Sequence, residues 1–390
     1  MPPFPRLHSK LAILLLTSAM AFSISAASQE IIQIASQADD LPAKFMKNAS
    51  FTEFAPKAHS SNSKLDYEIW DEALKNVVLD LGPSTRQRAS RPQTSVGTRM
   101  VKGHKSAYRL EGTRVTFAYI NDEYKAGLIA YREDLEWVAS NNDLTRLSRD
   151  EQLAFWFNLH NVALIEQIAL NYPIDNPDRI KVEVDGQKVK MDEAKIINIR
   201  NRKLSLRDIR EKIVYSNWAD PNVMYGFYRG NIGSPGLPKT AFRGDNLDYL
   251  LGRSADEFVN SLRGFNSTTR TRYVSKIYDE AKQYYFKNWE SDLPTHLLTH
   301  ANDTVRAEVL TNKPIKIDKY DINIGDLSGG RRLGSSGLAS YGDLGMSAET
   351  ARLLDEVRKK QDFLRRNDMV KRKTGFVIIE ELVPEDKKGQ

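Results

Sequence analysis

A largely apolar stretch of the chain, residues 147–165, carries polar residues inside it. Ser148 followed three residues later by Glu151 is typical of a helix N-cap with a capping-box partner. Almost every later position of this stretch is apolar, which predicts a helix buried on all sides. Glu151, Asn158 and Asn161 are costly to bury in such a helix unless they are hydrogen-bonded. They therefore predict either a structural network or a site.

Weaker patterns predict the other elements. Helical spacing predicts helices over residues 65–81, 122–140, 247–262, 276–288 and 348–371, and a further one that begins near Ser205. Apolar and alternating runs predict strands at 115–119, 220–228 and 375–379, and a hairpin of 180–184 with 187–191 around Asp185-Gly186. Short strands among many helices predict an α+β fold, in which the central helix packs on a small, mostly antiparallel sheet.

The N-terminus has the composition of a secretory signal peptide. Arg6 and Lys10 precede an apolar run at 11–22, and Ser25-Ala26-Ala27 supplies small residues for cleavage after Ala27. We therefore expect a secreted or periplasmic protein. No other stretch approaches the ~20 apolar residues of a spanning helix, so we expect no membrane span in the mature chain. The alternative is an uncleaved N-terminal anchor.

The remaining chain divides by composition. We predict a flexible lead-in at 28–64, a domain at 65–325, a Gly-rich linker or wrapping loop at 326–346, and a C-terminal helix and strand at 347–390. With 390 residues and 41% hydrophobic content, the chain can bury a substantial core.

Composition also limits the chemistry. The chain has no cysteine, which excludes disulfides, Cys-ligated zinc and a thiol nucleophile. Residues 82–109 hold seven Lys and Arg and no acid. This segment is either a solvated surface loop, the interpretation we prefer, or a basic insertion that contacts anionic polymer or lipid headgroups.

Three blocks of the chain resemble a known family. Residues 147–173, with Asp-Glu-Gln-Leu-Ala-Phe-Trp-Phe-Asn-Leu-His-Asn at their centre, residues 204–209 and residues 220–237 are similar in order and spacing to successive blocks of the bacterial and plant family called domain of unknown function 547. The resemblance covers about residues 65–325. It implies an α+β domain of the papain-like and transglutaminase-like group, and it implies no assigned activity.

The chain departs from this family at the positions that bear on chemistry. His160 stands where the family usually has Tyr, and Met224 where it usually has His. Arg229 and Ser234 occupy positions where relatives often carry cysteines. Any thiol and imidazole chemistry of relatives is therefore missing at those positions.

Helical geometry groups the polar residues of the central stretch. At about 100° per residue, Glu151, Asn158 and Asn161 share one face, and His160 points elsewhere. We expect Glu151 to cap its own helix and the two asparagines to tie adjacent loops to the core, because amides are not general bases. The alternative is that the three orient a ligand or a water molecule.

Two functions follow from these residues. We predict a non-catalytic or degenerate binding protein with a pocket between the central helix and residues 220–237. Its partner would be an envelope peptide, glycan or protein, and we expect no specific nucleic acid. The candidate binding residues are Glu151, Asn158, Asn161, Asp220 and Arg229.

The alternative function is an atypical hydrolase or acyl transferase that uses His160, Glu151 and Ser234. Ser234 lies on a glycine-rich turn, but the first glycine of Gly-x-Ser-x-Gly is absent. His296 and His300 have the spacing of zinc ligands on a helix, but the Glu expected after the first His is Leu297 and a third ligand is not evident. We therefore predict no metal site and no cofactor.

Overall fold

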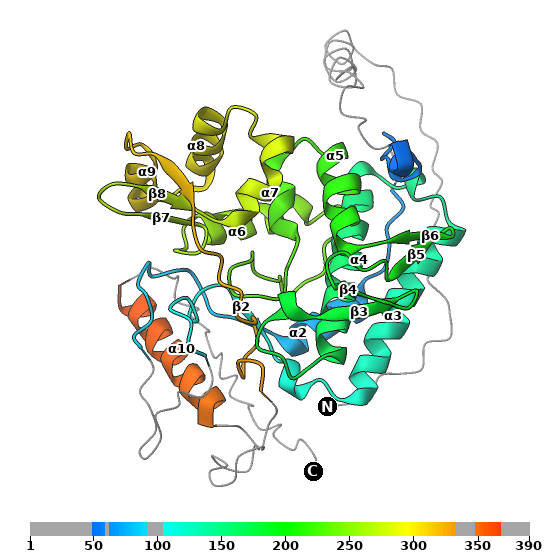
Figure 1. Ribbon diagram of the computed structural model, residues 1–390, viewed down its shortest axis with the longest axis horizontal. Helices are drawn as coiled ribbons and strands as arrows, with labels where there is room; N and C mark the ends of the chain where they lie inside the picture. Colours follow the sequence, from blue (N-terminus) through cyan, green and yellow to red (C-terminus); the bar gives the residue numbers. More distant parts are fainter. Residues whose placement is uncertain (1–48, 59–61, 92–103, 332–347, 368–390) are drawn as a thin grey trace, which may run out of the picture.

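The computed structural model describes residues 49–58, 62–91, 104–331 and 348–367, and over this part helices surround several small sheets (Figure 1). The α-helices are α2 (Glu68–Val77), α3 (Asp122–Asn141), α4 (Arg149–Leu170), α5 (Tyr215–Asn217), α6 (Leu247–Val259), α7 (Lys276–Tyr285), α8 (Trp289–His300), α9 (Asp303–Val309) and α10 (Ala348–Arg366). The 3-10 helices are η2 (Ala49–Phe54), η3 (Phe117–Tyr119), η4 (Leu144–Arg146), η5 (Pro177–Arg179) and η7 (Pro221–Gly226), and η6 (Asp208–Val214) is a π-helix. The predicted α+β class is confirmed.

The strands form four small sheets within the described residues. They are β1 (Val78–Asp80) with β2 (Thr113–Val115), β3 (Lys181–Val184) with β4 (Gln187–Lys190), β5 (Ile197–Ile199) with β6 (Arg202–Leu204), and β7 (Phe265–Ser267) with β8 (Arg272–Val274) and β9 (Ile315–Ile317). All pairs are antiparallel except β8 with β9. The predicted hairpin is confirmed, with Asp185 and Gly186 at the positive φ values of a primed turn, 50° and 78°.

Helix α4 is the buried centre of the fold and lies beside α3 in Figure 1. The Ser148 hydroxyl accepts a hydrogen bond from the Glu151 amide at 3.2 Å, which confirms the predicted N-cap. The Glu151 carboxylate instead accepts from the amide of Gly244, so it binds a distant loop rather than its own helix end. The principal neighbours of α4 are α3 and η6, and the expected single sheet beneath this helix is replaced by the separate small sheets.

Two predicted strands differ in the structure. The segment expected as a strand at 220–228 contains the 3-10 helix η7, because Pro221 suits a first helical position and the Asp220 carboxylate caps the amide of Asn222 at 2.8 Å. The strand expected at 115–119 ends at Val115 and continues as η3. In both segments the apolar residues reflect burial between other elements, which occurs equally in helices and strands.

The described part of the basic segment is only partly a solvated loop. Arg88, Arg91 and Lys105 are exposed, as that interpretation predicts, but two other arginines are anchored. Arg86 donates to Glu308 at 2.8 Å, and Arg109 is buried and donates to Glu356 at 2.7 Å. The two acids lie 222 and 247 residues further along the chain. Local sequence therefore gave no sign of them.

Helix α10 packs against the body of the described structure. Leu353 and Val357 form a small apolar cluster with Leu81 and Leu327. The buried Lys360 ammonium donates to the carbonyls of Gly82 and Leu110, and burial lowers the pKa of Lys360 to about 8. The C-terminal helix therefore belongs to the same packed unit.

Several predictions fall outside the described residues. These are the signal peptide, most of the lead-in and of the Gly-rich linker, and the strand at 375–379. Among the described helices, none combines the length and the apolar character needed to cross a membrane.

Candidate functional site

The two asparagines of α4 are bound to the backbone of neighbouring segments. Asn158 donates to the carbonyl of Phe242 at 2.8 Å and accepts from the amide of the same residue at 3.0 Å. Asn161 donates to the carbonyl of Gly226 at 3.0 Å and accepts from the amide of Tyr228 at 3.2 Å. Both side chains are buried, so the predicted role of tying loops to the core accounts for their hydrogen-bonding groups.

Aromatic packing fills the contact between α4 and residues 220–237 at the level of Phe157. The Phe157 ring lies 4.8 Å from the rings of both Phe227 and Phe242, measured between centroids. A Cβ atom added to Gly226 would lie 2.5 Å from the Phe157 ring, closer than atoms can approach. At this level the helix and the loop leave no room for a ligand.

His160 is wholly buried, and both ring nitrogens are occupied. Nε2 lies 3.1 Å from Nη1 of Arg210, and because a guanidinium only donates, Nε2 is the acceptor. Nδ1 therefore carries the proton and donates to Asn161 at 3.1 Å. Burial, and then the charges of Arg210 and Arg229, hold the pKa of His160 well below its ordinary value, so the ring is neutral.

The three candidates for hydrolysis do not converge. The Ser234 hydroxyl is buried and donates toward the carbonyls of Asn231 and Pro235, at 2.8 and 3.1 Å, rather than to a base. Glu151 lies nine residues before His160 on one helix, roughly 13 Å along its axis. Burial raises the pKa of Glu151, but its carboxylate contacts the Gly244 amide and neither of the other candidates.

Arg229 belongs to a set of charged side chains that we call the Arg229 cluster, defined as Asp192, Arg210, Arg229 and Glu280. Arg210 binds Asp192 through two parallel hydrogen bonds of 2.6 and 2.7 Å. Arg229 donates to Glu280 at 2.8 Å. Asp192 follows β4, Arg210 lies in η6, Arg229 follows η7 and Glu280 lies in α7. His160 of α4 contacts Arg210. Five segments therefore meet at this point.

The cluster runs from the interior to the surface. The Arg210 side chain is 1% exposed and that of Arg229 11%, whereas Glu280 keeps 25% and Asp192 34%. Burial alone would raise the pKa of both carboxylates, but the paired guanidiniums outweigh it and lower the pKa of each. Both carboxylates are therefore charged at neutral pH, and both side chains remain partly exposed to solvent.

Buried polar atoms around this cluster leave hydrogen-bonding capacity unused. Nε of Arg210 and Oδ1 of Asn231 have no partner among the described residues, and Nε of Arg229 and the hydroxyl of Tyr215 have at most each other. Tyr215 is close enough to Arg229 for that charge to hold down a pKa that burial raises. Buried polar atoms in native proteins are nearly always bonded to protein, water or ligand. Unused hydrogen-bonding capacity is therefore gathered beside accessible carboxylates.

Sequence reasoning found Arg229 and missed the other three members of the cluster. Arg210 carried a usable signal, because it lies among Leu206, Ile209, Ile213 and Val214, at a position of the apolar helical stripe. Asp192 and Glu280 carried no such sequence signal, since each is one of many acids in a polar stretch. Of the other predicted binding residues, Asp220 is exposed and caps η7.

The two histidines with zinc-like spacing bind protein groups instead. Nε2 of His296 lies 2.8 Å from the Tyr225 hydroxyl. The ring nitrogens of His300 lie 2.8 Å from Asp256 and from Asn222. Within the described ranges, no group of three or more His, Asp or Glu side chains is arranged to hold a metal ion.

Comparison with known families agrees with the resemblance found in the sequence. Residues 144–259 match the model of a family described as "Protein of unknown function, DUF547". This span contains α4, Asp192, Arg210 and Arg229, whereas Glu280 lies beyond it. No curated protein and no solved structure matches the chain.

Proposed function

We propose that this chain is an exported, non-catalytic binding protein whose Arg229 cluster recognises a dipolar ligand, such as a peptide with free ends. One observation carries the proposal. Buried arginines that keep N–H groups outside their ion pairs are paired with carboxylates that keep accessible surface.

The chemistry of the cluster favours binding over catalysis. Its arginines cannot act as bases, and its carboxylates are held ionised by their partners. The adjacent His160 is neutral and has both nitrogens engaged, so it is not positioned to move a proton for a substrate. The nearby Ser234 hydroxyl contacts carbonyl oxygens only as a donor, without a base to activate it.

The charges suggest which ligand fits. The partly exposed carboxylates of Asp192 and Glu280 suit a cationic group, and the buried Nε–H groups of Arg210 and Arg229 beside them suit an acceptor or an anion that reaches them. A peptide carries an ammonium, a carboxylate and amide oxygens within one small molecule. Among envelope peptides, glycans and proteins, we therefore favour the peptide.

Export and fold class complete the proposal. Residues 1–27 support cleavage after Ala27 and a secreted or periplasmic location, and N-terminal sequencing of the exported protein tests both. The papain-like or transglutaminase-like assignment rests on the family resemblance.

Calorimetry with trialanine tests the binding proposal. We expect free-ended trialanine to bind, and acetylation or amidation of its ends to abolish the heat of binding. Glu280→Gln keeps the shape and an acceptor oxygen for Arg229 but removes the negative charge. It should therefore weaken binding by about tenfold, the equivalent of about 1.4 kcal/mol.

Glu257→Gln is the matched control. Glu257 is 22% exposed and pairs with the buried Arg263, which reproduces the burial of the Glu280 pair elsewhere in the molecule. The control should lose comparable stability and keep its affinity. No binding of trialanine, or equal weakening by both variants, would refute the proposal. A glycan captured from native envelope extract in place of a peptide would also refute it.

A further inference from the structure

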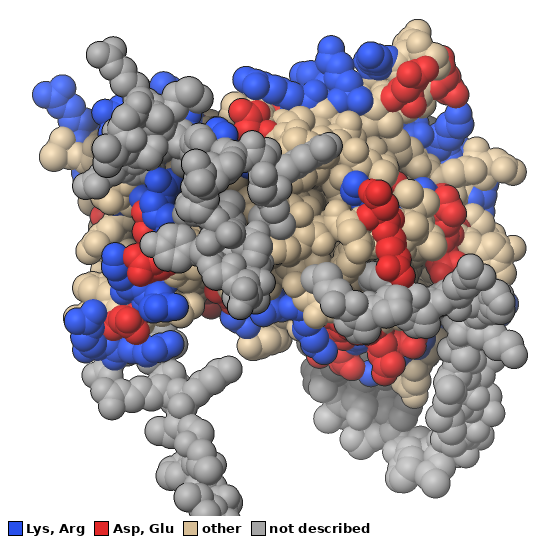
Figure 2. All heavy atoms as spheres, turned by 90° about the horizontal axis from the view of Figure 1, so that it is seen from below, with Lys and Arg blue, Asp and Glu red and all other residues tan. Residues whose placement is uncertain are grey.

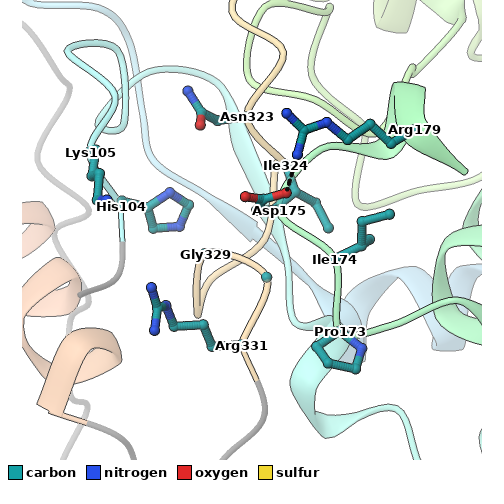
Figure 3. Close-up of a pocket in the computed structure, with 11 residues that line it drawn as sticks. His104, Lys105, Pro173, Ile174, Asp175, Arg179, Asn323, Ile324, Gly329 and Arg331 are labelled. Carbon is teal, nitrogen blue, oxygen red and sulfur yellow. Dashed lines mark ion pairs between the residues drawn. The ribbon is translucent and has the colours of Figure 1, made fainter. Parts of the chain in front are cut away.

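A second hollow lies apart from the Arg229 cluster, with a volume of about 790 Å³. Three segments line it, residues 104–105, 173–179 and 323–331 (Figure 3). Cavities of this size accommodate small-molecule ligands.

The lining has an excess of positive charge. Lys105, Arg179 and Arg331 come from the three different segments, and Asp175 is the one acid among the lining residues. Asp175 pairs with Arg179 at 3.6 Å, and both side chains are at least 70% exposed, so water screens the pair. Within the described residues, the Lys105 and Arg331 side chains have no acidic partner.

His104 adds no charge to this lining. Its Nε2 bonds the carbonyl of Asp326, and burial followed by the nearby Arg114 charge lowers the pKa of His104 to about 3. The ring is therefore neutral at physiological pH. The positive charge of the cavity resides on the lysine and the two arginines.

Asp326 holds the three walls in place. Its wholly buried carboxylate accepts from the Tyr172 hydroxyl at 2.9 Å and from the amide of Gly330 at 2.8 Å, and its carbonyl bonds His104. These contacts fix the residue before Pro173, the turn before Arg331 and the residue before Lys105. The cationic side chains are thus carried by walls that are connected before any ligand arrives.

The turn that carries Arg331 could not form with an ordinary residue at Gly330. Gly330 has φ of 80°, and a Cβ atom there would lie 2.1 Å from the carbonyl oxygen of Ile174. Two walls of the cavity therefore touch through a glycine. A third link between them is the bond from the Ile324 amide to the Asp175 carbonyl, at 2.9 Å.

We propose that this cavity binds a small ligand with two or more oxyanion charges, such as a phosphate ester or a polycarboxylate. Guanidinium groups bind phosphate and carboxylate oxygens through paired hydrogen bonds, and the lysine adds a mobile positive charge. The site belongs to none of the functions assigned above, and it gives the basic segment a defined role through Lys105.

The surface charge favours a local site over a long polyanion. Figure 2 shows Lys and Arg side chains interspersed with Asp and Glu over the face seen from below. Mixed charge of this kind produces no extended field of one sign on that face. That face therefore offers no extended positive surface for a long polyanion.

Binding of inorganic pyrophosphate and of citrate to the full chain, measured calorimetrically at low and moderate salt, tests the proposal. We expect at least one probe to bind, more weakly as salt rises. Tighter binding of pyrophosphate assigns phosphate chemistry, and tighter binding of citrate assigns carboxylate chemistry. The double variant Lys105→Gln with Arg331→Gln should weaken that binding by about tenfold or more.

Lys188→Gln with Lys239→Gln is the matched control. Both lysines are exposed, lie outside the cavity lining, and remove the same total charge. The control should change affinity by less than about twofold. If neither probe binds, or if the control weakens binding as much as the cavity variant, the proposal is wrong.

Discussion

Helix α4 and the cavity lined by Lys105, Arg179 and Arg331, which we call the Lys105 cavity, use polar side chains in opposite ways. On α4, Asn158 and Asn161 are buried, and their amide groups bond the backbone of loops that pack against the helix. In the cavity walls, the Lys105 and Arg331 side chains point from anchored backbone and have no acidic partner among the described residues. The α4 asparagines therefore use their hydrogen bonds to stabilise the fold, whereas the cations of the cavity walls can bind a ligand.

The Arg229 cluster lies between these two extremes. Its arginines are buried and paired like the α4 asparagines, yet each keeps one N–H outside its ion pair. Its carboxylates retain accessible surface like the cavity cations. The comparison teaches that a buried polar group whose hydrogen bonds are all made marks a constraint of the fold, whereas a polar group with an unused hydrogen bond marks capacity to bind.

The largest effect should come from removing both α4 asparagines. Asn158→Ala with Asn161→Ala leaves four buried backbone groups of Phe242, Gly226 and Tyr228 without their side-chain partners. We expect the free energy of unfolding to fall by roughly 4 kcal/mol, measured by urea denaturation. Binding of pyrophosphate to the protein that remains folded should be unchanged. Retained stability together with lost binding would reverse the roles assigned to the two regions.

A smaller effect on the free energy of unfolding should appear when Asp326 is titrated. Its carboxylate is buried like the α4 asparagines, yet it also connects the walls of the cavity. Burial raises the pKa of Asp326 to about 6, against about 4 in the unfolded chain. Its stabilising contribution is therefore fully present below about pH 4 and is lost as the pH rises through about 6. Relative to Asp326→Asn, which does not titrate, the wild-type chain should lose roughly 2–3 kcal/mol over that range.

Urea denaturation of both proteins at several pH values measures this difference. A difference that stays constant with pH would mean that the pKa of Asp326 is the same in the folded and unfolded chain, with its hydrogen bonds balancing burial. The measurement also checks whether the cavity walls loosen when Asp326 ionises, because pyrophosphate affinity can be followed in the same samples.

The sequence predicted the elements whose signal is local. The α4 helix, its Ser148 cap and the Asp185-Gly186 hairpin each depend on residues within a few positions of one another. The shared face of Glu151 and Asn158 was also predictable from helical spacing, and both bind the 242–244 loop. The amides of Phe242 and Gly244 that they bind could not be predicted, because every residue except proline has a backbone amide.

Contacts between distant segments account for what the sequence missed. The 3-10 helix at Pro221–Gly226 has the apolar composition of a buried strand, and the apolar residues are buried mainly against the distant helices α6 and α7. The cavity joins residues 104–105 to 323–331, more than 200 positions apart, through the backbone carbonyl of Asp326. Nothing local distinguishes Asp326 from the other acids of the chain.

The smallest effect on stability should come from the exposed ion pair of Arg179 and Asp175 in the cavity lining. Breaking this pair from either side should change binding in opposite directions. Arg179→Gln and Asp175→Asn each break an ion pair of 3.6 Å between mostly exposed side chains, so each should cost less than about 0.5 kcal/mol. Arg179→Gln removes a cation and should weaken pyrophosphate binding about threefold, whereas Asp175→Asn removes the opposing acid and should strengthen it by a similar factor. Calorimetric titration of both variants measures the two shifts. Since the variants break the same pair, a purely structural role would move both affinities in the same direction, and only a ligand that responds to the charge of the cavity would separate them.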